Sequence, residues 1–479
     1  MELLKKFFSF SIGSYISLVI GFFSLPIIAR IISPEQYGIF SFFLLITNLG
    51  NSLLILGLEQ GFARYFYEEK NKTLLLYNCL RYPILMWCIL STIIFLNKET
   101  ISFFIYNENN IKMLLILILV LFISILKTFS FVSIRMSKEG FKYSLLQILE
   151  QLFNLIFIFI INKIYIKTYE ILIISYFLSN LFAVLISVFL NRNIWKIKNL
   201  KTQDVNLKIS DLLKYSLPFV LTFSLSWIFT SSDKLILKKY STLNELGLYA
   251  MSFTVIKLFN IIQSGFTLFW VPVAYEKYNQ DPKNKIFFQI VFNNISFIML
   301  LFAVIVLMSK NLIILLLGER YYSVSMVMPC LVFMPIMYTV SETTVLGINF
   351  SKRTKYHTII SLFVMIFNII GNMILVSKIG AKGAAISTGV AYILFFFLRT
   401  YLAGKLINYN FKLKRFYLVS FLVFLYSLYL TFYNNIIFNL LFGIVLIIIL
   451  IKLYFKEIKI IFYYVQSSHL NFIKRNKKY

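Results

Sequence analysis

The sequence predicts an all-α polytopic membrane protein with about 14 transmembrane helices, arranged as two six-helix lobes related by a parallel repeat plus two C-terminal helices. Three observations predict this fold. The 479 residues are 59% hydrophobic and only 14% charged, which is too few charges to cover a soluble protein of this length. Apolar runs near the ~20 residues that a helix needs to cross a bilayer follow one another along the chain. Two segments of the first half also recur in the second half.

The apolar runs are long and continuous, so they indicate helices rather than the alternating strands of a membrane barrel, which are about ten residues long. The run closest to the N-terminus carries no small-residue cleavage site, so we expect an uncleaved first helix. The predicted spans lie near 10–32, 38–60, 77–97, 111–134, 143–163, 169–191, 212–235, 247–270, 286–308, 322–347, 356–377, 383–404, 416–433 and 436–455.

Lys and Arg gather in every second connecting segment, on the side that also carries both termini. Cytoplasmic loops of membrane proteins carry such an excess. We therefore expect a multi-pass protein of the cytoplasmic membrane with both termini cytoplasmic. The net charge of +28 follows this loop pattern, so we do not interpret it as nucleic-acid binding.

Two sequence matches indicate an internal repeat. The segment PEQYGIF at 34–40 matches LNELGLY at 243–249, and each joins the first span of its half to the second. The segment 137–156 resembles 351–370, and each joins a fourth span to a fifth. The offsets, 209 and 214 residues, are nearly equal, so the halves share one topology.

The repeat defines three predicted domains. Residues 1–200 form an N-terminal six-helix lobe and residues 205–405 a C-terminal six-helix lobe, while residues 406–479 contain two additional transmembrane helices and a basic cytoplasmic tail. An even number of spans gives both lobes the same orientation, as in transporters with parallel repeats around a central cavity. A channel or a structural protein is the alternative.

Motifs for catalysis are missing from the sequence. It contains neither the GxxxxGK[ST] phosphate loop nor HExxH, and its three cysteines show no metal-site spacing. We therefore expect no enzyme, no metal and no cofactor, while coupling to a proton or sodium ion gradient stays open.

Ionisable residues inside the spans are the candidate functional residues, since each costs roughly 2.5–3.5 kcal/mol to insert and normally faces a cavity or a partner. The deepest are Lys127, Glu150, Lys257 and Glu342. Lys257 lies in the eighth span, and Asn260 follows at i+3 on the same helical face. This polar stripe suits an anion such as a phosphate; a lysine paired with a neighbouring carboxylate is the alternative.

Lys127 and Glu342 occupy nearly equivalent positions in the fourth spans of the two lobes. They could pair across the cavity as a gate, or each could pair within its own lobe, and the second arrangement is favoured. Glu150 is a candidate carrier of a coupling proton, with a helix–helix hydrogen bond as the alternative.

Two further charged sites lie at span ends. Arg64, near the inner end of the second span with Glu59, could bind an entering phosphate or extend to lipid headgroups. Asp233 is grouped with the gating or ion-coupling candidates, and a local ion pair with Lys234 is its alternative.

Several segments resemble the polysaccharide flippases that export O-antigen and capsule repeat units, a family of the multidrug/oligosaccharidyl-lipid/polysaccharide exporter superfamily. The resemblance covers roughly residues 5–405. It rests on SFSIGSYISLVIGFFSLPIIARIISPEQYGIFSFF, GLEQGFARYF, SSDKLILKKYSTLNELGLYAMSF and FNIIGNMILVSKIGAKGAAISTGVAYILFFFLR. Lipid II flippases of the superfamily carry clustered arginines in their first helix. Only Arg30 stands there in this chain, which argues against that subgroup.

The resemblance implies a bacterial flippase that moves undecaprenyl-pyrophosphate-linked oligosaccharides across the cytoplasmic membrane by alternating access, for O-antigen, lipopolysaccharide, capsule or related glycan synthesis. It places Arg64, Lys127 and Lys257 near the pyrophosphate by their position in the cavity. The implied partners are the lipid-linked oligosaccharide, membrane lipids, and a polysaccharide polymerase with glycosyltransferases. The alternatives are a cation-coupled multidrug antiporter, for which Glu150 is the deep acidic candidate, and a non-transporting scaffold of a glycan assembly complex.

Overall fold

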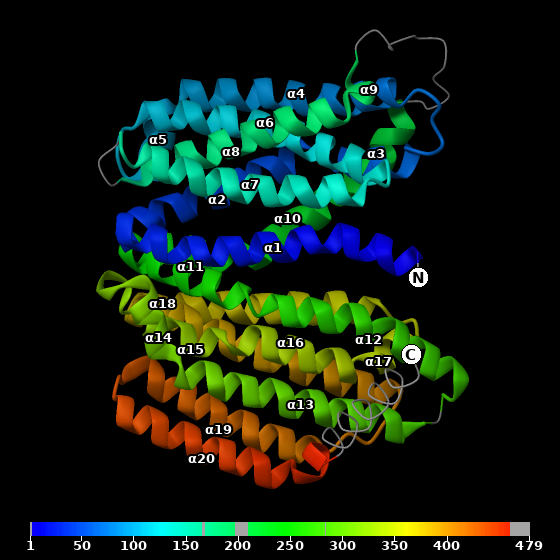
Figure 1. Cartoon of the computed structure of the whole chain (residues 1–479), viewed down its shortest axis with the longest axis vertical. Helices are drawn as coiled ribbons and strands as arrows, with labels where there is room; N and C mark the ends of the chain where they lie inside the picture. The colour runs from blue at the N-terminus through cyan, green and yellow to red at the C-terminus, as the bar shows by residue number, and fades with distance from the viewer. Residues whose placement is uncertain (1, 165–167, 197–208, 283, 460–479) are drawn as a thin grey trace, which may run out of the picture. The chain divides into compact units, whose positions relative to one another are not determined.

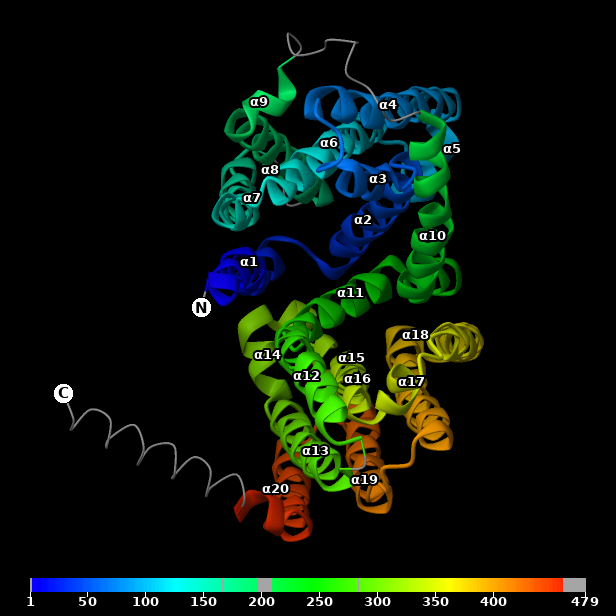
Figure 2. The ribbon, with the colours of Figure 1, turned by 90° about the vertical axis from the view of Figure 1, so that its right-hand side faces the viewer.

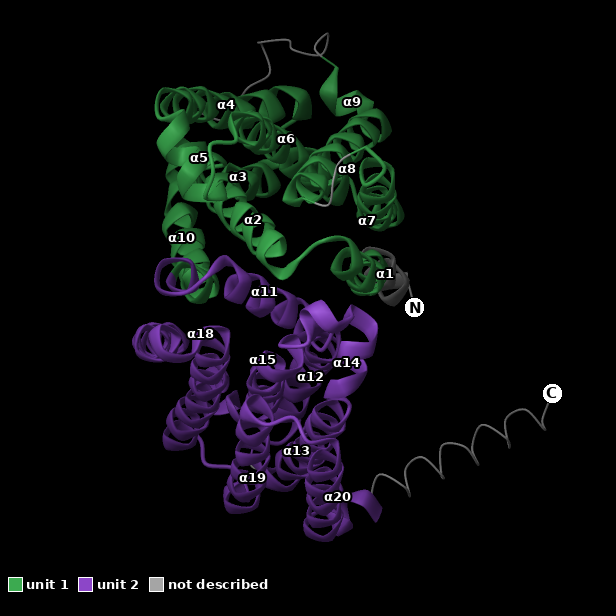
Figure 3. Cartoon of the chain, turned by 90° about the vertical axis from the view of Figure 1, so that its left-hand side faces the viewer, with its two compact units in different colours: residues 1–235 green, residues 236–479 purple. Residues whose placement is uncertain are grey.

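The computed structural model describes residues 2–164, 168–196, 209–282 and 284–459. Throughout these ranges the regular structure is helical, with no strand. Contacts between Cα atoms divide the chain into two compact units, Met1–Leu235 and Ile236–Tyr479 (Figure 3). The predicted lobe boundary at 200–205 and the basic tail from 460 onward lie outside the described residues, so the predicted domain limits stay a prediction.

Long helices lie side by side in the first unit (Figure 1). Its helices are α1 (Glu2–Ile31), α2 (Pro34–Leu54), α3 (Leu58–Tyr65), α4 (Lys72–Leu96), α5 (Lys98–Tyr106), α6 (Ile111–Met136), α7 (Gly140–Ile161), α8 (Tyr169–Leu190), α9 (Arg192–Trp195) and α10 (Ile209–Tyr240), which runs into the second unit. Figure 2 shows α8 between α7 and α6, and α8 packs against both of these helices.

The second unit begins within the last turns of α10, and several of its spans are interrupted. It contains α11 (Leu243–Lys257), α12 (Asn260–Gln280), α13 (Lys285–Met308), α14 (Lys310–Leu317), the 3₁₀ turn η3 (Glu319–Tyr321), α15 (Val324–Leu331), α16 (Phe333–Thr344), α17 (Leu346–Phe350), α18 (Lys355–Leu406), α19 (Leu413–Phe432) and α20 (Ile436–Leu453).

Among the described residues, 13 helical segments are long and apolar enough to cross a membrane. One of them, α18, is a double span of 52 residues whose backbone leaves helical geometry at Ile379 and Gly380. Gly380 has φ +55°, a conformation that glycine adopts without steric cost. Counting α18 as two crossings gives the fourteen predicted, and the predicted fold class is confirmed.

The first sequence match forms the same helix start in both units. Ser33 caps α2 by accepting a hydrogen bond from the Gln36 backbone N–H, and Thr242 caps α11 by accepting one from Glu245. A Ser or Thr followed three residues later by Gln or Glu is the capping-box pattern. The repeat is therefore encoded at the level of single hydrogen bonds.

The glutamine and glutamate of these caps also reach the sixth span of their own unit. Gln36 Oε1 accepts a hydrogen bond from the backbone N–H of Tyr169 at the start of α8, over 2.9 Å. Glu245 Oε2 accepts one from Ala381 N–H, just after the kink of α18, over 2.7 Å. Free N–H groups at helix starts need such acceptors, so the second and sixth spans are tied together in both units.

The second sequence match forms the same turn. Lys138 follows α6 with φ +63°, and Lys352 follows α17 with φ +55°. The next residue in each case donates its N–H five residues back, from Glu139 to the Ile134 carbonyl and from Arg353 to that of Ile348. This bond with a left-handed residue is the Schellman helix end.

Packing follows the same repeat. Ile134 and Leu146 belong to a buried apolar cluster of the first unit, and Ile348 and Ile360, each 214 residues later, belong to one of the second. The two units thus bury equivalent faces of their fourth-to-sixth spans.

The last two helices pack on the second unit through α13 and α15. Lys310 at the start of α14 is fully buried, and its Nζ donates hydrogen bonds to the carbonyls of Leu430 (2.9 Å) and Tyr433 (3.1 Å) at the end of α19. Cations are favourable at helix C-termini, so this lysine anchors α19.

Candidate functional site

Lys127 lies at the centre of a polar cluster in the first unit. Its Nζ is 2.6 Å from Glu150 Oε1 on α7 and 2.7 Å from Asn180 Oδ1 on α8. The lysine and glutamate side chains are only 25% and 18% exposed. Sequence reasoning singled out Lys127 and Glu150 separately, and the structure brings them together. Each therefore neutralises the other's charge inside the apolar bundle.

Glu342 on α16 has a corresponding partner in the second unit. Arg399 on α18 donates through Nη1 to Glu342 Oε1 over 2.9 Å and to Ser341 Oγ over 2.5 Å. Both charged side chains are less than one-tenth exposed. The guanidinium also lies over the rings of Phe395 and Tyr338, at 5.0 and 5.4 Å from their centroids. This is a desolvated ion pair.

Of the two arrangements considered for Lys127 and Glu342, the structure has each residue paired within its own unit. The polarity is reversed, because the fourth span supplies the cation in the first unit and the anion in the second. Arg399 was missed by sequence reasoning. It lies near the C-terminal end of the predicted span 383–404, where an arginine is commonly a headgroup anchor.

Lys257 lies at a 3₁₀ turn in the eighth span. The predicted span over 247–270 lies within one candidate membrane span, Leu243–Gln280, in which α11 ends at Lys257 and α12 begins at Asn260. Leu258 and Phe259 donate their N–H groups only three residues back, which is the tighter spacing of a 3₁₀ turn. Both residues keep right-handed helical backbone angles, so the span tightens here and continues into α12.

The surroundings of Lys257 differ from those of the paired cations. Its side chain is exposed, and within the described parts of the chain its Nζ makes neither an ion pair nor a hydrogen bond. It lies 5.5 Å from the centroid of the Phe253 ring. Asn260 carries a buried Oδ1 that no hydrogen-bond donor of the described residues reaches. Among the described residues, no carboxylate therefore pairs with Lys257.

The two remaining candidates are placed differently. Arg64 on α3 is half exposed and forms an ion pair with Glu68 one turn later. Asp233 is buried on α10 beside Lys234. Their proposed roles in phosphate binding and in ion coupling stay predictions.

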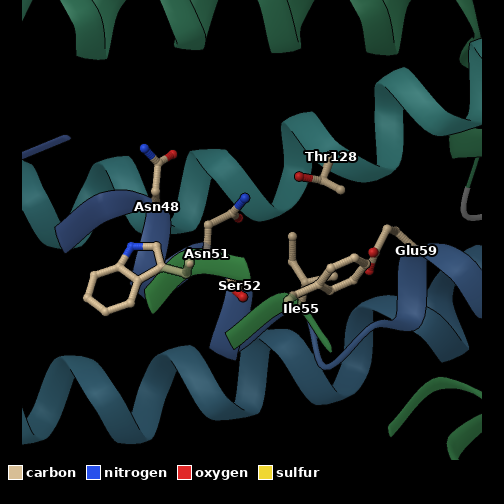
Figure 4. Close-up of a pocket in the computed structure, with 8 residues that line it drawn as sticks. Asn48, Asn51, Ser52, Ile55, Glu59 and Thr128 are labelled. Carbon is tan, nitrogen blue, oxygen red and sulfur yellow. The ribbon is translucent and has the colours of Figure 1, made fainter. Parts of the chain in front are cut away.

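A cavity of about 320 Å³ opens within the first unit, between α2, α6 and α10 (Figure 4). Figure 4 shows Asn51 and Ser52 on one helix, Thr128 on another, and Glu59 beyond the end of the first. The lining residues are Asn48, Asn51, Ser52, Ile55, Glu59, Thr128, Phe223 and Trp227. Of these residues, only Glu59 could be singled out from the sequence. Asparagine and serine are uncharged, so their presence in a span does not indicate a functional site.

In the part of the chain that the structure describes, no group of three or more His, Cys, Asp or Glu side chains lies close enough together to bind a metal ion.

Comparison with solved structures identifies the fold. The lipid II flippase MurJ in an inward closed conformation superposes with a TM-score of 0.67 at 17% sequence identity, covering 94% of this chain and 99% of that one. An inward-facing multidrug resistance transporter of the MATE family superposes with a TM-score of 0.56 at 12% identity, covering 82% and 94%. Its outward-facing counterpart gives 0.54 at 14% identity, covering 84% and 95%. At these identities the comparison shows a shared fold.

Comparison at the level of sequence identifies the family. No curated protein sequence matches the chain at a significant level. The model of the family described as "Polysaccharide biosynthesis protein" matches residues 27–326, which is more than half of the chain. The chain therefore belongs to this family of polysaccharide biosynthesis proteins.

Proposed function

We propose that this protein is a flippase that moves undecaprenyl-pyrophosphate-linked oligosaccharide repeat units across the bacterial cytoplasmic membrane by alternating access. The glycan would be an O-antigen, a capsule or a related polysaccharide, and both termini would be cytoplasmic. Membership of the polysaccharide biosynthesis family and the fold shared with a lipid II flippase support this proposal. The charged residues of this chain then indicate which chemical group of the transported lipid the protein binds.

The observation that carries the proposal is the ammonium of Lys257, which has no ion-pair partner among the described residues and lies where α11 meets α12 in a candidate membrane span. A cation held at membrane depth without a carboxylate is costly unless an anion reaches it. Interrupted helices in transporters commonly form the substrate site. A lipid-linked pyrophosphate supplies the missing negative charge, while its polyprenyl tail stays in lipid.

The test is the leaflet distribution of lipid-linked saccharides in cells depleted of the protein. A membrane-impermeant reagent that labels saccharides on intact spheroplasts separates the outer from the inner pool. We expect one complete repeat unit to accumulate on the cytoplasmic leaflet. An unchanged pool with normal surface glycan would overturn the proposal.

A charge variant connects this result to the site. Lys257→Met removes the ammonium and keeps the side-chain length, and we expect it to reduce glycan export at least tenfold. The matched control is Lys277→Met in the same unit, which removes an exposed lysine whose Nζ contacts Gln280. Equal export by the two variants would show that Lys257 does not bind the cargo.

A multidrug antiporter is the second candidate, because the fold is shared with MATE-family transporters. In this chain the acidic residue expected to carry a coupling ion, Glu150, is already paired with Lys127. The antiporter predicts that Glu150→Gln abolishes ion-dependent drug efflux, and the flippase predicts unchanged drug sensitivity. A glycan-assembly scaffold predicts that Lys257→Met has no effect on export.

A further inference from the structure

Polar side chains of α2 and α3 gather at one cavity, and we call four of them, Asn48, Asn51, Ser52 and Glu59, the stripe. Asn48, Asn51 and Ser52 lie on α2, whereas Glu59 lies on α3, which begins after a turn in which Leu56 and Gly57 have positive φ. All four side chains line the cavity of the first unit (Figure 4).

The opposite wall of the cavity comes from α10, which approaches α3 closely because of two glycines. A Cβ on Gly57 would collide with the Ser216 carbonyl oxygen, and one on Gly61 with the Ser216 hydroxyl. Small residues four apart allow helices in membranes to pack at this distance. The approach places Phe223 and Trp227 in the cavity wall.

The indole N–H of Trp227 is already used, since Nε1 donates to the Leu45 carbonyl over 3.2 Å. This hydrogen bond fixes the ring against α2. Trp227 therefore contributes an apolar aromatic surface to the cavity, and the polar chemistry comes from the stripe.

Three oxygen atoms of the stripe have no hydrogen-bond partner among the described residues. They are Asn51 Oδ1, Ser52 Oγ and Glu59 Oε2, and each is buried. Buried acceptors are nearly always satisfied in folded proteins, so each of these is suited to a ligand that donates hydrogen bonds. All three residues that carry these oxygens line one cavity of about 320 Å³.

A bound metal ion does not fit this geometry. Glu59 is the one charged residue among those that line the cavity, and no group of three or more His, Cys, Asp or Glu gathers in the described residues, whereas Ca²⁺ takes six to eight oxygen ligands, carboxylates among them. A phosphate does not fit either, because it would meet a carboxylate and further acceptors without a lysine or arginine among the lining residues.

We propose that this cavity is a saccharide-binding subsite, in which hydroxyl groups of a neutral sugar donate hydrogen bonds to the orphan oxygens of α2 and α3. Sugars combine many O–H donors with apolar ring faces, which match the stripe and the aromatic wall of Phe223 and Trp227 respectively. The cavity volume falls at the lower end of the ~300–1,000 Å³ of small-molecule sites, which suits one sugar residue. This inference rests on the proposed flippase function and assigns recognition of the glycan to the first unit.

The experiment measures binding of two lipids to the full-length protein in nanodiscs. One lipid is undecaprenyl pyrophosphate carrying a single N-acetylhexosamine, and the other is undecaprenyl pyrophosphate without sugar. We expect the wild type to bind the sugar-bearing lipid at least tenfold more tightly. Asn51→Leu, which is nearly isosteric, and Ser52→Ala, which removes one oxygen atom, should each reduce this ratio several-fold and leave the affinity for the sugar-free lipid unchanged.

Asn154→Leu is the matched control, since Asn154 is a partly buried asparagine of the same unit that contacts Ser179 outside the cavity. It should leave the ratio at the wild-type value. Unchanged binding of the sugar-free lipid also shows that a variant is folded. Equal wild-type affinity for both lipids, or a ratio that Asn51→Leu and Ser52→Ala do not alter, would overturn the subsite and leave the flippase standing. Failure of the wild type to bind either lipid would instead overturn the proposed function.

Discussion

Replacement of Arg399 by methionine tests whether the ion pair of the second unit is a buried one. The guanidinium contacts Glu342 and Ser341, and both charged side chains are less than one-tenth exposed. Arg399→Met retains most of the side-chain volume but leaves the Glu342 carboxylate without its counter-ion. Removing one partner of a buried pair costs roughly 3–5 kcal/mol, because the remaining charge is still desolvated.

The expected change is large enough for a thermal melt of the purified protein in detergent. A unit of this size loses about 2 °C in melting temperature per kcal/mol, so the midpoint should fall by roughly 6–10 °C. The comparison variant is Lys127→Met. The Lys127–Glu150 pair is about one-fifth exposed, so solvent screens the remaining carboxylate and the fall should be clearly smaller.

The double variant Arg399→Met/Glu342→Met distinguishes charge from packing. With both charges removed, no uncompensated carboxylate remains, and most of the lost stability should return. A double variant no more stable than Arg399→Met, or a single-variant shift below about 2 °C, would refute the reasoning.

Three further predictions follow from single side chains. Gly380→Ala places a Cβ 2.6 Å from Glu245 Oε2 at a φ of +55° and should destabilise the second unit by roughly 1–3 kcal/mol in the same melt. Gly57→Ala should have a similar effect on the first unit, whereas Gly21→Ala, with no atom within 4 Å of its added Cβ, should have none or stabilise slightly. Burial lowers the pKa of Lys310 to about 8, below the ~10.4 of a lysine in an unfolded chain. The buried charge therefore lowers the free energy of unfolding at and below pH 8. This destabilisation disappears as the pH rises to ~10, where the lysine is neutral in the folded protein. Melts at about pH 7.5 and 9.5 should show a stability rise that is about 1–3 kcal/mol smaller in Lys310→Met than in the wild type.

Hydropathy and internal similarity predicted most of the fold because both are collective signals. A span is marked by about twenty residues together, so single polar positions do not hide it. The repeat was visible at 34–40 and 137–156 because helix starts and helix-end turns require particular residue types at fixed spacings. The kink of α18 lies at Ile379 and Gly380, between the predicted spans 356–377 and 383–404, and glycine is the residue type that its backbone conformation favours.

The 3₁₀ turn after Lys257 could not be predicted, since neither proline nor glycine stands at Leu258 or Phe259. Tertiary packing imposes it, and the sequence locally suits a continuous helix. Sequence reasoning likewise found the charges of the candidate site but not their partners. Which carboxylate meets Lys127, and that Arg399 meets Glu342, depends on helix rotation within each bundle.

The distribution of paired and unpaired charges fits the proposed mechanism. Lys127 and Glu342 are each neutralised within their own unit, so a movement of one unit against the other need not break a buried ion pair. Such pairs cost several kcal/mol to separate, and a cycle that separated them at every turnover would be slow. Lys257, by contrast, has no carboxylate partner within the described ranges, so an anion could bind it without first displacing one. In the proposed mechanism, the charges that stabilise each unit are therefore different residues from the charge that binds the cargo. Arg399→Met should lower the stability of the protein more than its affinity for undecaprenyl pyrophosphate. Lys257→Met should lower that affinity more than the stability.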